Sequence, residues 1–267
     1  MRILFNDLIH DAILTSLGGS DSYPVSNLAS PYLRKRYQAS GTTDTITVTF
    51  SQDKTIDSLF WGYTNIKTML VTFYNASDEI VQIVYFNEGD VGYYYGYGTE
   101  DLYGYDPDNY YGYYERLSDH AYDPVSWHFG QDVTFRYATF EIEADETAYL
   151  GAIGLGQAVE MPDPQAEWEE DWDDKSIVSY SQAGQVQSQY VEPMRVYDFS
   201  FDGISRDRMN ALREVYKTYG IGHIIWVDPT ERAPDFMTPM YASLLAWGKD
   251  KKDGLQYSFS ITVKEAR

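Results

Sequence analysis

The chain of 267 residues is long enough for two domains of ordinary size, each with a hydrophobic core of its own. Its cysteine count of zero excludes a disulfide framework, a thiolate metal site and a cysteine nucleophile. The 20 Lys and Arg residues against 41 Asp and Glu residues give a formal net charge of -21, so we expect no binding to nucleic-acid phosphates or anionic bilayers.

The N-terminal segment predicts neither a targeting sequence nor a membrane anchor. Residues 1–7 turn acidic before a long apolar run develops, and no later stretch approaches the length that spans a bilayer. We therefore expect no signal peptide and no membrane insertion.

Short strands joined by polar turns are predicted over the first part of the chain. Residues 45–50 alternate strictly between apolar and hydroxyl side chains, which is typical of a half-buried strand. A turn is predicted at residues 51–54, and further strands at residues 55–61, 69–74 and 80–86. Short strands at this spacing, without helical periodicity, indicate an antiparallel sandwich.

A tyrosine-rich insertion interrupts this pattern over residues 88–123. The chain has 26 tyrosines, more than a core needs, because each buried phenol requires a hydrogen-bond partner. Flat phenols beside carboxylates can stack on sugar rings, and they can equally form a subunit contact or pack on their own sandwich; we slightly favour the second use. The candidate ligand or interface residues are Tyr94, Tyr95, Tyr97, Tyr103, Tyr105, Tyr110, Tyr111, Tyr113 and Tyr114.

The strand pattern resumes at residues 133–142 and closes with a glycine-containing strand at residues 149–156. This completes a predicted first domain, residues 1–158. Residues 159–175 combine prolines with a dense acidic run, which predicts an exposed acidic linker. A second domain is predicted at residues 176–267.

The second domain is predicted to be a small β-sheet packed on one α-helix. Strands are expected at residues 197–201, 221–227 and 257–263. Ser205 has the position of an N-cap and Gly220 that of a helix stop. The apolar stripe of this helix is formed by Met209, Leu212, Val215, Tyr216 and Tyr219.

Several weak motifs, taken in order, give the first domain a family resemblance. They comprise Asn27, Leu28, Pro31, Arg36, Tyr37, Ile46 to Phe50, Ile56 to Ile66, Arg136 to Ile142 and Leu150 to Gly156. Residues 25–158 thereby resemble the galactose-binding-like, discoidin-type jelly roll that phage tail proteins often carry. The step at Tyr63 and Thr64 is shorter than in that family and the tyrosine-rich insertion separates the halves, so the family's sugar site is not carried over.

The second domain looks, by its layout, like C-terminal modules that accompany such sandwiches in phage minor tail proteins. The fold class expected for the whole chain is therefore mainly β. We expect an N-terminal antiparallel jelly-roll sandwich and a smaller C-terminal β-sheet module packed on one α-helix.

No residue pattern nominates a catalytic or metal site. The many carboxylates could form a large number of pairs, and the sequence does not give the distance between the members of any of them. The histidines His10, His120, His128 and His223 lie too far apart in sequence for a zinc motif. Oxygen-rich segments at residues 106–109 and 169–174 lack EF-hand spacing. Sandwiches of the family that the first domain resembles sometimes hold a structural calcium near the early loops, which here corresponds to Asn27 or Asp44, but no residue pattern supports such a site. We therefore predict no catalytic residue, no metal and no cofactor.

These observations lead to a non-enzymatic interpretation with one main alternative. The resemblance implies a structural component of a bacteriophage tail or baseplate, located in the virion after synthesis in the host cytoplasm. Its partners would be other tail proteins and further copies of the chain around the tail axis. The alternative is a carbohydrate-binding adhesin module that contacts host surface glycans, and an enzyme that degrades capsule or cell wall is a third possibility without a nominated residue.

Overall fold

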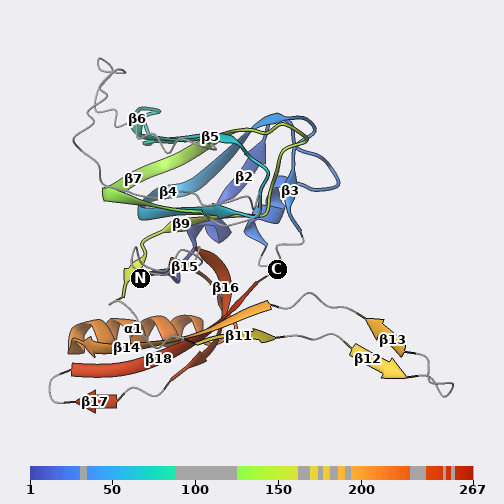
Figure 1. Ribbon diagram of the computed structural model, residues 1–267. Coiled ribbons are helices and arrows are strands. Elements are labelled where there is room, and N and C mark those ends of the chain that lie inside the picture. Colours follow the sequence, from blue (N-terminus) through green and yellow to red (C-terminus); the bar gives the residue numbers. More distant parts are fainter. Residues whose placement is uncertain are drawn as a thin grey trace. The chain divides into compact units, whose positions relative to one another are not determined.

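The computed structural model describes residues 1–30, 35–87, 125–161, 169–173, 177–180, 186–189, 194–228, 239–248, 251–253 and 256–266. They are mainly β, as the sequence predicts, with antiparallel strand pairs and one α-helix (Figure 1). The chain forms two compact units. The sandwich unit is built on Asn6–Ala158, and the helix unit on Met1–Phe5, Val159–Arg232 and Met240–Arg267.

The sandwich unit contains a six-stranded antiparallel sheet in the order β2-β4-β7-β5-β6, with β9 paired to β4. A two-stranded sheet, β3-β8, and two short 3-10 helices, η1 and η2, complete it. The bounds are η1 Leu8–Asp11, β2 Ile13–Ser16, η2 Val25–Ala29, β3 Tyr37–Gln38, β4 Thr43–Gly62, β5 Thr68–Tyr74, β6 Ile80–Asn87, β7 Val125–Glu143, β8 Tyr149–Leu150 and β9 Ala152–Gly156.

Strand β4 shows how the alternating sequence positions the sheet. Ile46, Val48 and Phe50 are buried, whereas the threonines between them lie on the opposite, outer face. The turn predicted at residues 51–54 is wrong, because β4 continues through them as one strand. Its register with β7 shifts between Thr49 and Lys54, so these polar residues form a bulge that bends the strand instead of ending it.

Aromatic rings form the centre of the sandwich core. The Phe135 ring contacts those of Phe50 and Phe73 edge-on, with ring centroids 5.6 and 4.9 Å apart, and the Phe135 side chain is fully buried. Trp61 and Trp127 both pack against Phe86 further along the same core. The alternating strands predicted from the sequence thus supply one continuous hydrophobic layer.

The glycine-containing segment at residues 149–156 is divided at Gly151 into β8 and β9. The Gly151 backbone donates hydrogen bonds to the carbonyls of Gly62 and Tyr63. A Cβ at this position would lie 2.6 Å from the Cβ of Tyr63. Glycine is therefore required by the close approach of two backbones rather than by its torsion angles.

The helix unit contains an eight-stranded antiparallel sheet in the order β10-β1-β15-β16-β18-β14-β11, with β17 paired to β18. The bounds are β1 Arg2–Leu4, β10 Val159–Glu160, β11 Glu169–Asp173, β14 Met194–Ile204, α1 Arg206–Tyr219, β15 Ile224–Asp228, β16 Met240–Trp247, β17 Lys251–Asp253 and β18 Gln256–Glu265.

Two segments depart from the predicted domain boundaries. Strand β1 belongs to the helix unit, where it pairs with β15 and β10, because Ile3 and Leu4 bury their side chains there completely. The expected acidic linker includes strand β11, which pairs with β14. Asp173 in β11 pairs with the Lys264 ammonium at 2.5 Å, so a cation compensates part of the acidic run.

Helix α1 begins and ends as predicted. The Ser205 hydroxyl accepts a hydrogen bond from the Arg208 backbone, and Gly220 ends the helix at a φ of 68°. Met209 and Leu212 are buried, whereas Tyr216 lies at the rim, stacked on Trp247. No helix among the described residues combines the length and the apolar character that crossing a bilayer demands.

Strands β12 (Ile177–Tyr180) and β13 (Val186–Gln189) form a separate antiparallel hairpin between β11 and β14. Within the described part of the chain, neither strand pairs with a third strand. A two-stranded hairpin is at best marginally stable in water, so we expect a contact with another surface to stabilise this hairpin.

Candidate binding site

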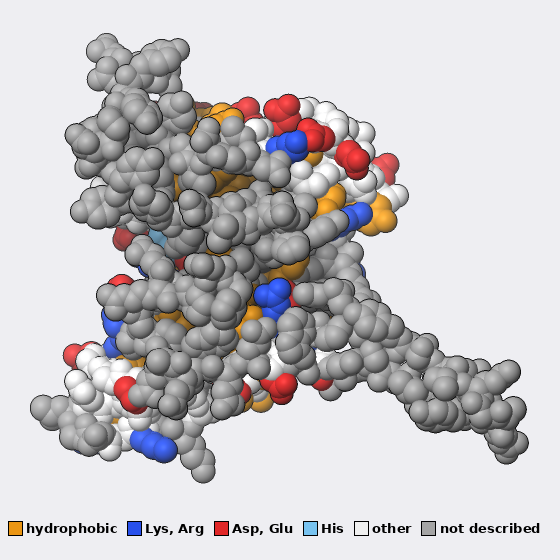
Figure 2. Space-filling model, viewed as in Figure 1, with side chains coloured by type: hydrophobic (Ala, Val, Ile, Leu, Met, Phe, Trp, Pro, Cys, Tyr) orange, Lys and Arg blue, Asp and Glu red, His pale blue; other side chains and the backbone are white. Residues whose placement is uncertain are grey.

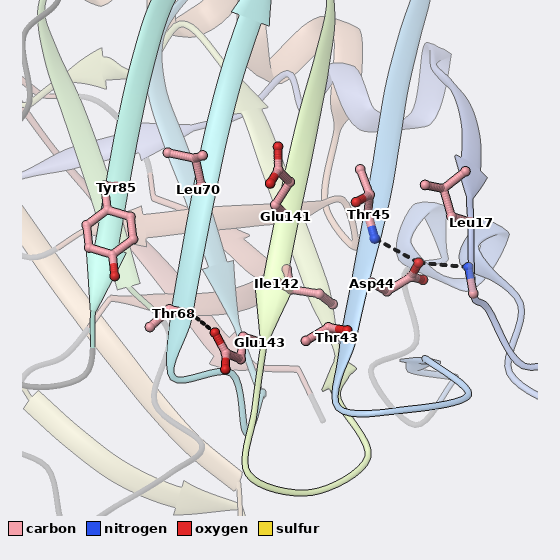
Figure 3. Close-up of a pocket in the computed structure, with 11 residues that line it drawn as sticks. Leu17, Thr43, Asp44, Thr45, Thr68, Leu70, Tyr85, Glu141, Ile142 and Glu143 are labelled. Carbon is pink, nitrogen blue, oxygen red and sulfur yellow. Dashed lines mark hydrogen bonds between the residues drawn. The ribbon is translucent and has the colours of Figure 1, made fainter. Parts of the chain in front are cut away.

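An open hollow of about 510 Å³ lies on the outer face of the sandwich sheet (Figure 3). Two transverse rows of side chains line it. The strand register places Thr45, Glu141, Leu70 and Tyr85 in the first row. Its volume lies in the range of small-molecule sites, and its position across several strands makes it elongated.

The second row begins with Thr43 and continues with Glu143 and Thr68 on the neighbouring strands. The Thr68 hydroxyl donates a hydrogen bond to the Glu143 carboxylate at 3.3 Å. Leu17, which donates its backbone N–H to the Thr45 carbonyl, closes the end next to β2. Neighbouring strands lie about 4.8 Å apart, so the hollow extends about 19 Å from Leu17 along the first row to Tyr85.

A network around Asp44 holds the Leu17 end in place. The carboxylate accepts backbone hydrogen bonds from Gly18 and Thr45, each at 2.7 Å. It also accepts a hydrogen bond from the phenol of Tyr37, a residue with no exposed surface. Asp44 is therefore a buried structural acceptor at the base of the hollow. The exposed carboxylates of the hollow are those of Glu141 and Glu143.

The outer face continues beyond the hollow as a partly apolar surface. Tyr74 and Tyr137 stack with ring centroids 4.6 Å apart. Partial burial and a hydrogen bond to the Asp78 carboxylate raise the pKa of the Tyr137 phenol. In the register Ile80 is the neighbour of Tyr74, and Ile13 lies one strand beyond Tyr137, across Thr49; the two isoleucines are 53% and 66% exposed. Single exposed aliphatic residues are common, but two on the same face as a half-buried tyrosine stack favour contact with a ligand or a protein.

Ser58, Asp57 and His128 also come together but do not form a nucleophilic site. The Ser58 hydroxyl donates to the Asp57 carboxylate at 2.6 Å and lies 2.8 Å from Nδ1 of His128. Since its only proton points to Asp57, the histidine nitrogen donates to the serine instead of accepting from it. Ser58 is fully buried, so this group ties β4 to β7 and does not face a substrate.

The predicted site residues fall into two groups. All nine candidate tyrosines of the insertion lie outside the described residues, so their role stays a prediction. Among the other candidates, Asn27 donates to the Arg36 carbonyl and Asp44 belongs to the network above. The described residues contain no group of three potential metal ligands.

The three histidines in the described part of the chain make separate local contacts. His10 contacts the Ala29 carbonyl at 2.9 Å, and His223 contacts the Phe5 carbonyl at 2.7 Å. His128 contacts Ser58, while His120 lies outside the described residues.

Apart from Asp44, sequence reasoning missed the residues of the hollow. Glu141 and Glu143 alternate with buried residues on β7, and the threonines of β4 do the same, so their common outer face was readable. Tyr85 and Leu17 carried no comparable signal, because their place depends on strand pairing over long sequence separations.

No protein-family model matches the chain, and no curated protein matches it. Among solved structures, the lectin domain of lectinolysin complexed with Lewis B antigen is similar over 58% of this chain and 98% of its own, with 7% identity and a TM-score of 0.40. A Streptococcus pneumoniae fucose binding module is similar over 57% and 94%, with 8% identity and a TM-score of 0.38. A pectin binding carbohydrate binding module is similar over 56% and 93%, with 10% identity and a TM-score of 0.37.

Proposed function

We propose that the sandwich unit is a non-catalytic module that binds an oligosaccharide in the outer-face hollow. The observation that carries this proposal is the combination of one aromatic ring, Tyr85, with the hydroxyls and carboxylates of both rows in an elongated open site. An aromatic ring can lie against the apolar face of a sugar, while hydroxyls and carboxylates bond its hydroxyl groups.

The carboxylate arrangement favours binding over hydrolysis. Glycosidases place two carboxylates on opposite sides of the bond that they cleave. Glu141 and Glu143 are two residues apart on one strand and therefore project side by side from the same face. They can both bond the same side of a saccharide, but they cannot enclose a glycosidic bond between them.

Replacing Tyr85 with alanine is expected to weaken oligosaccharide binding about tenfold, because the ring supplies the main apolar contact. The measurement is a glycan-array screen of the full chain, followed by calorimetry with the tightest oligosaccharide. Tyr85→Phe keeps the ring and should retain most of the affinity. Ile83→Ala removes the next outward side chain of β6 and should bind like the wild type.

Two results would overturn this proposal. The first is an absence of binding across neutral, basic and acidic glycans. The second is binding that Tyr85→Ala leaves unchanged, which would place the saccharide elsewhere on the molecule.

A second proposal is assembly into a bacteriophage tail or baseplate, in several copies. The observation that favours assembly is the β12-β13 hairpin, whose strands pair with no third strand in the described part of the chain. Such a hairpin gains stability when a neighbouring subunit covers it. The phage setting itself rests on the family resemblance.

Light scattering on the purified chain at high concentration tests this assembly. The wild type is expected to form oligomers, and replacing residues 177–189 with a short Gly-Ser turn is expected to give monomers. Co-purification with a tail subassembly would support the phage setting. A wild type that stays monomeric and joins no tail subassembly would refute the second proposal without affecting saccharide binding.

A further inference from the structure

We infer that the hollow selects a cationic saccharide, an oligomer of 2-amino-2-deoxy sugars with free amines, over its N-acetylated and acidic counterparts. This inference rests on the proposed saccharide function and adds the chemical class of the ligand. It follows from the charges that line the site.

The described lining residues include three carboxylates and no Lys, Arg or His side chain. Asp44 uses its oxygens within the fold, whereas Glu141 and Glu143 are exposed on the outer face. Thr68 bonds Glu143 with a neutral hydroxyl, which leaves its charge in place. A ligand in this hollow therefore meets at least two exposed carboxylates, with no cationic side chain among the described lining residues.

The cation nearest to these residues in sequence pairs with a carboxylate that does not line the hollow. Lys67 immediately precedes Thr68, but its ammonium is paired with the carboxylate of Asp145. Figure 2 shows acidic side chains on the part of the sandwich unit that this view displays, with Lys or Arg side chains among them. The net charge of -21 adds a field of the same sign.

This charge pattern distinguishes between classes of sugar. A uronic or sialic acid would bring its carboxylate beside Glu141 and Glu143, and like charges repel. A neutral sugar would gain hydrogen bonds only. An ammonium group gains charge-assisted hydrogen bonds, which are stronger than neutral ones. Both carboxylates are exposed, so each pair contributes modestly and weakens with salt.

The geometry also favours an oligomer over a single sugar. The Cα atoms of Glu141 and Glu143 lie about 7 Å apart along β7, and the hollow extends across the strands to Tyr85. One sugar on the Tyr85 ring leaves room for further units toward Leu17. Successive amines of the same oligomer can then approach Glu141 and Glu143.

The test is calorimetry with the full chain and three tetrasaccharides: glucosamine, N-acetylglucosamine and galacturonic acid tetramers. We expect the glucosamine tetramer to bind at least tenfold more tightly than the N-acetylated one, and the acidic one to bind most weakly. Glu141→Gln and Glu143→Gln should each lower glucosamine affinity about threefold, and the double variant about tenfold. Their affinity for the N-acetylated tetramer should fall less than their affinity for the glucosamine tetramer, because the Gln amide can still bond sugar hydroxyls but carries no charge, so the selectivity ratio should narrow.

A matched control removes the same charge elsewhere. Glu79→Gln lies in the turn at the other end of β5 and β6, where the Gln oxygen can still accept the hydrogen bond from Asn75. This variant should retain wild-type selectivity. Equal loss in Glu79→Gln would show that net charge alone acts, and it would overturn the assignment to the hollow.

The remaining outcomes separate the inference from the proposed function. If the N-acetylated or acidic tetramer binds as tightly as the glucosamine tetramer, charge selection is refuted and saccharide binding stands. If no tetrasaccharide binds and the glycan-array screen is also negative, the proposed function fails. If tetralysine binds as tightly as the glucosamine tetramer and displaces it, the hollow recognises positive charge and not a sugar, which overturns the inference.

Discussion

Replacing Phe135 with alanine is expected to lower the free energy of unfolding of the sandwich unit by about 3–5 kcal/mol, the range for truncating a fully buried aromatic side chain. The ring is completely buried between Phe50 and Phe73, so its loss leaves a cavity as well as lost contacts. Urea denaturation followed by tryptophan fluorescence measures the change, since Trp61 and Trp127 both belong to this core.

The neighbouring residue provides the control. Thr134 is exposed, and its hydroxyl bonds that of Thr55 across the strands at 2.8 Å. Thr134→Ala should cost less than about 1 kcal/mol, because an exposed hydroxyl recovers its hydrogen bond from water. A Phe135→Ala change no larger than that of Thr134→Ala would contradict the description of this ring as the centre of the core.

Replacing Asp44 with alanine is expected to destabilise the sandwich unit by about 3 kcal/mol, because hydrogen bonds to a charged acceptor contribute about 1.5–3 kcal/mol each and are only partly replaced by water. The change leaves the buried Tyr37 phenol without its acceptor. It also releases the Gly18 backbone, which positions the Leu17 end of the hollow. Thermal unfolding monitored by circular dichroism measures the loss.

Asp44→Asn tests the hydrogen bonds separately from the charge. Its amide oxygen can still accept from the backbones of Gly18 and Thr45, so we expect about half of the alanine effect. Saccharide affinity should fall in Asp44→Ala and recover largely in Asp44→Asn. An Asn variant as unstable as the Ala variant would show that the charge, and not the bonded geometry, stabilises this corner.

The strands were predictable where a local pattern determines the buried face. Apolar and polar residues alternate so regularly in residues 45–50 and 257–263 that each sequence position indicates its side of the sheet. The first segment lies in strand β4 and the second in strand β18. Helix α1 was equally clear, because Ser205 and Gly220 act within one turn of its ends. In each case the deciding interactions are close in sequence.

The hollow was not predictable because no local pattern contains it. Thr45 reaches Glu141 through one strand pairing, and Glu141 reaches Tyr85 through two more, so the site exists only after the register of four strands is set. The departures at β1 and β11 have the same origin. Whether a short segment forms a strand or a linker is decided by pairing partners that lie far away in the sequence.

The place of β1 in the helix unit has a consequence for synthesis on the ribosome. Arg2–Leu4 leaves the ribosome before the whole sandwich unit, whereas its partner Ile224–Asp228 follows after it. The sandwich can therefore complete its own contacts first and β1 can pair with β10, which follows the sandwich directly, while the second partner of β1 arrives far later. Closing that gap places the ends of a large, already folded segment side by side, which costs less chain entropy than closing an unfolded loop of the same length.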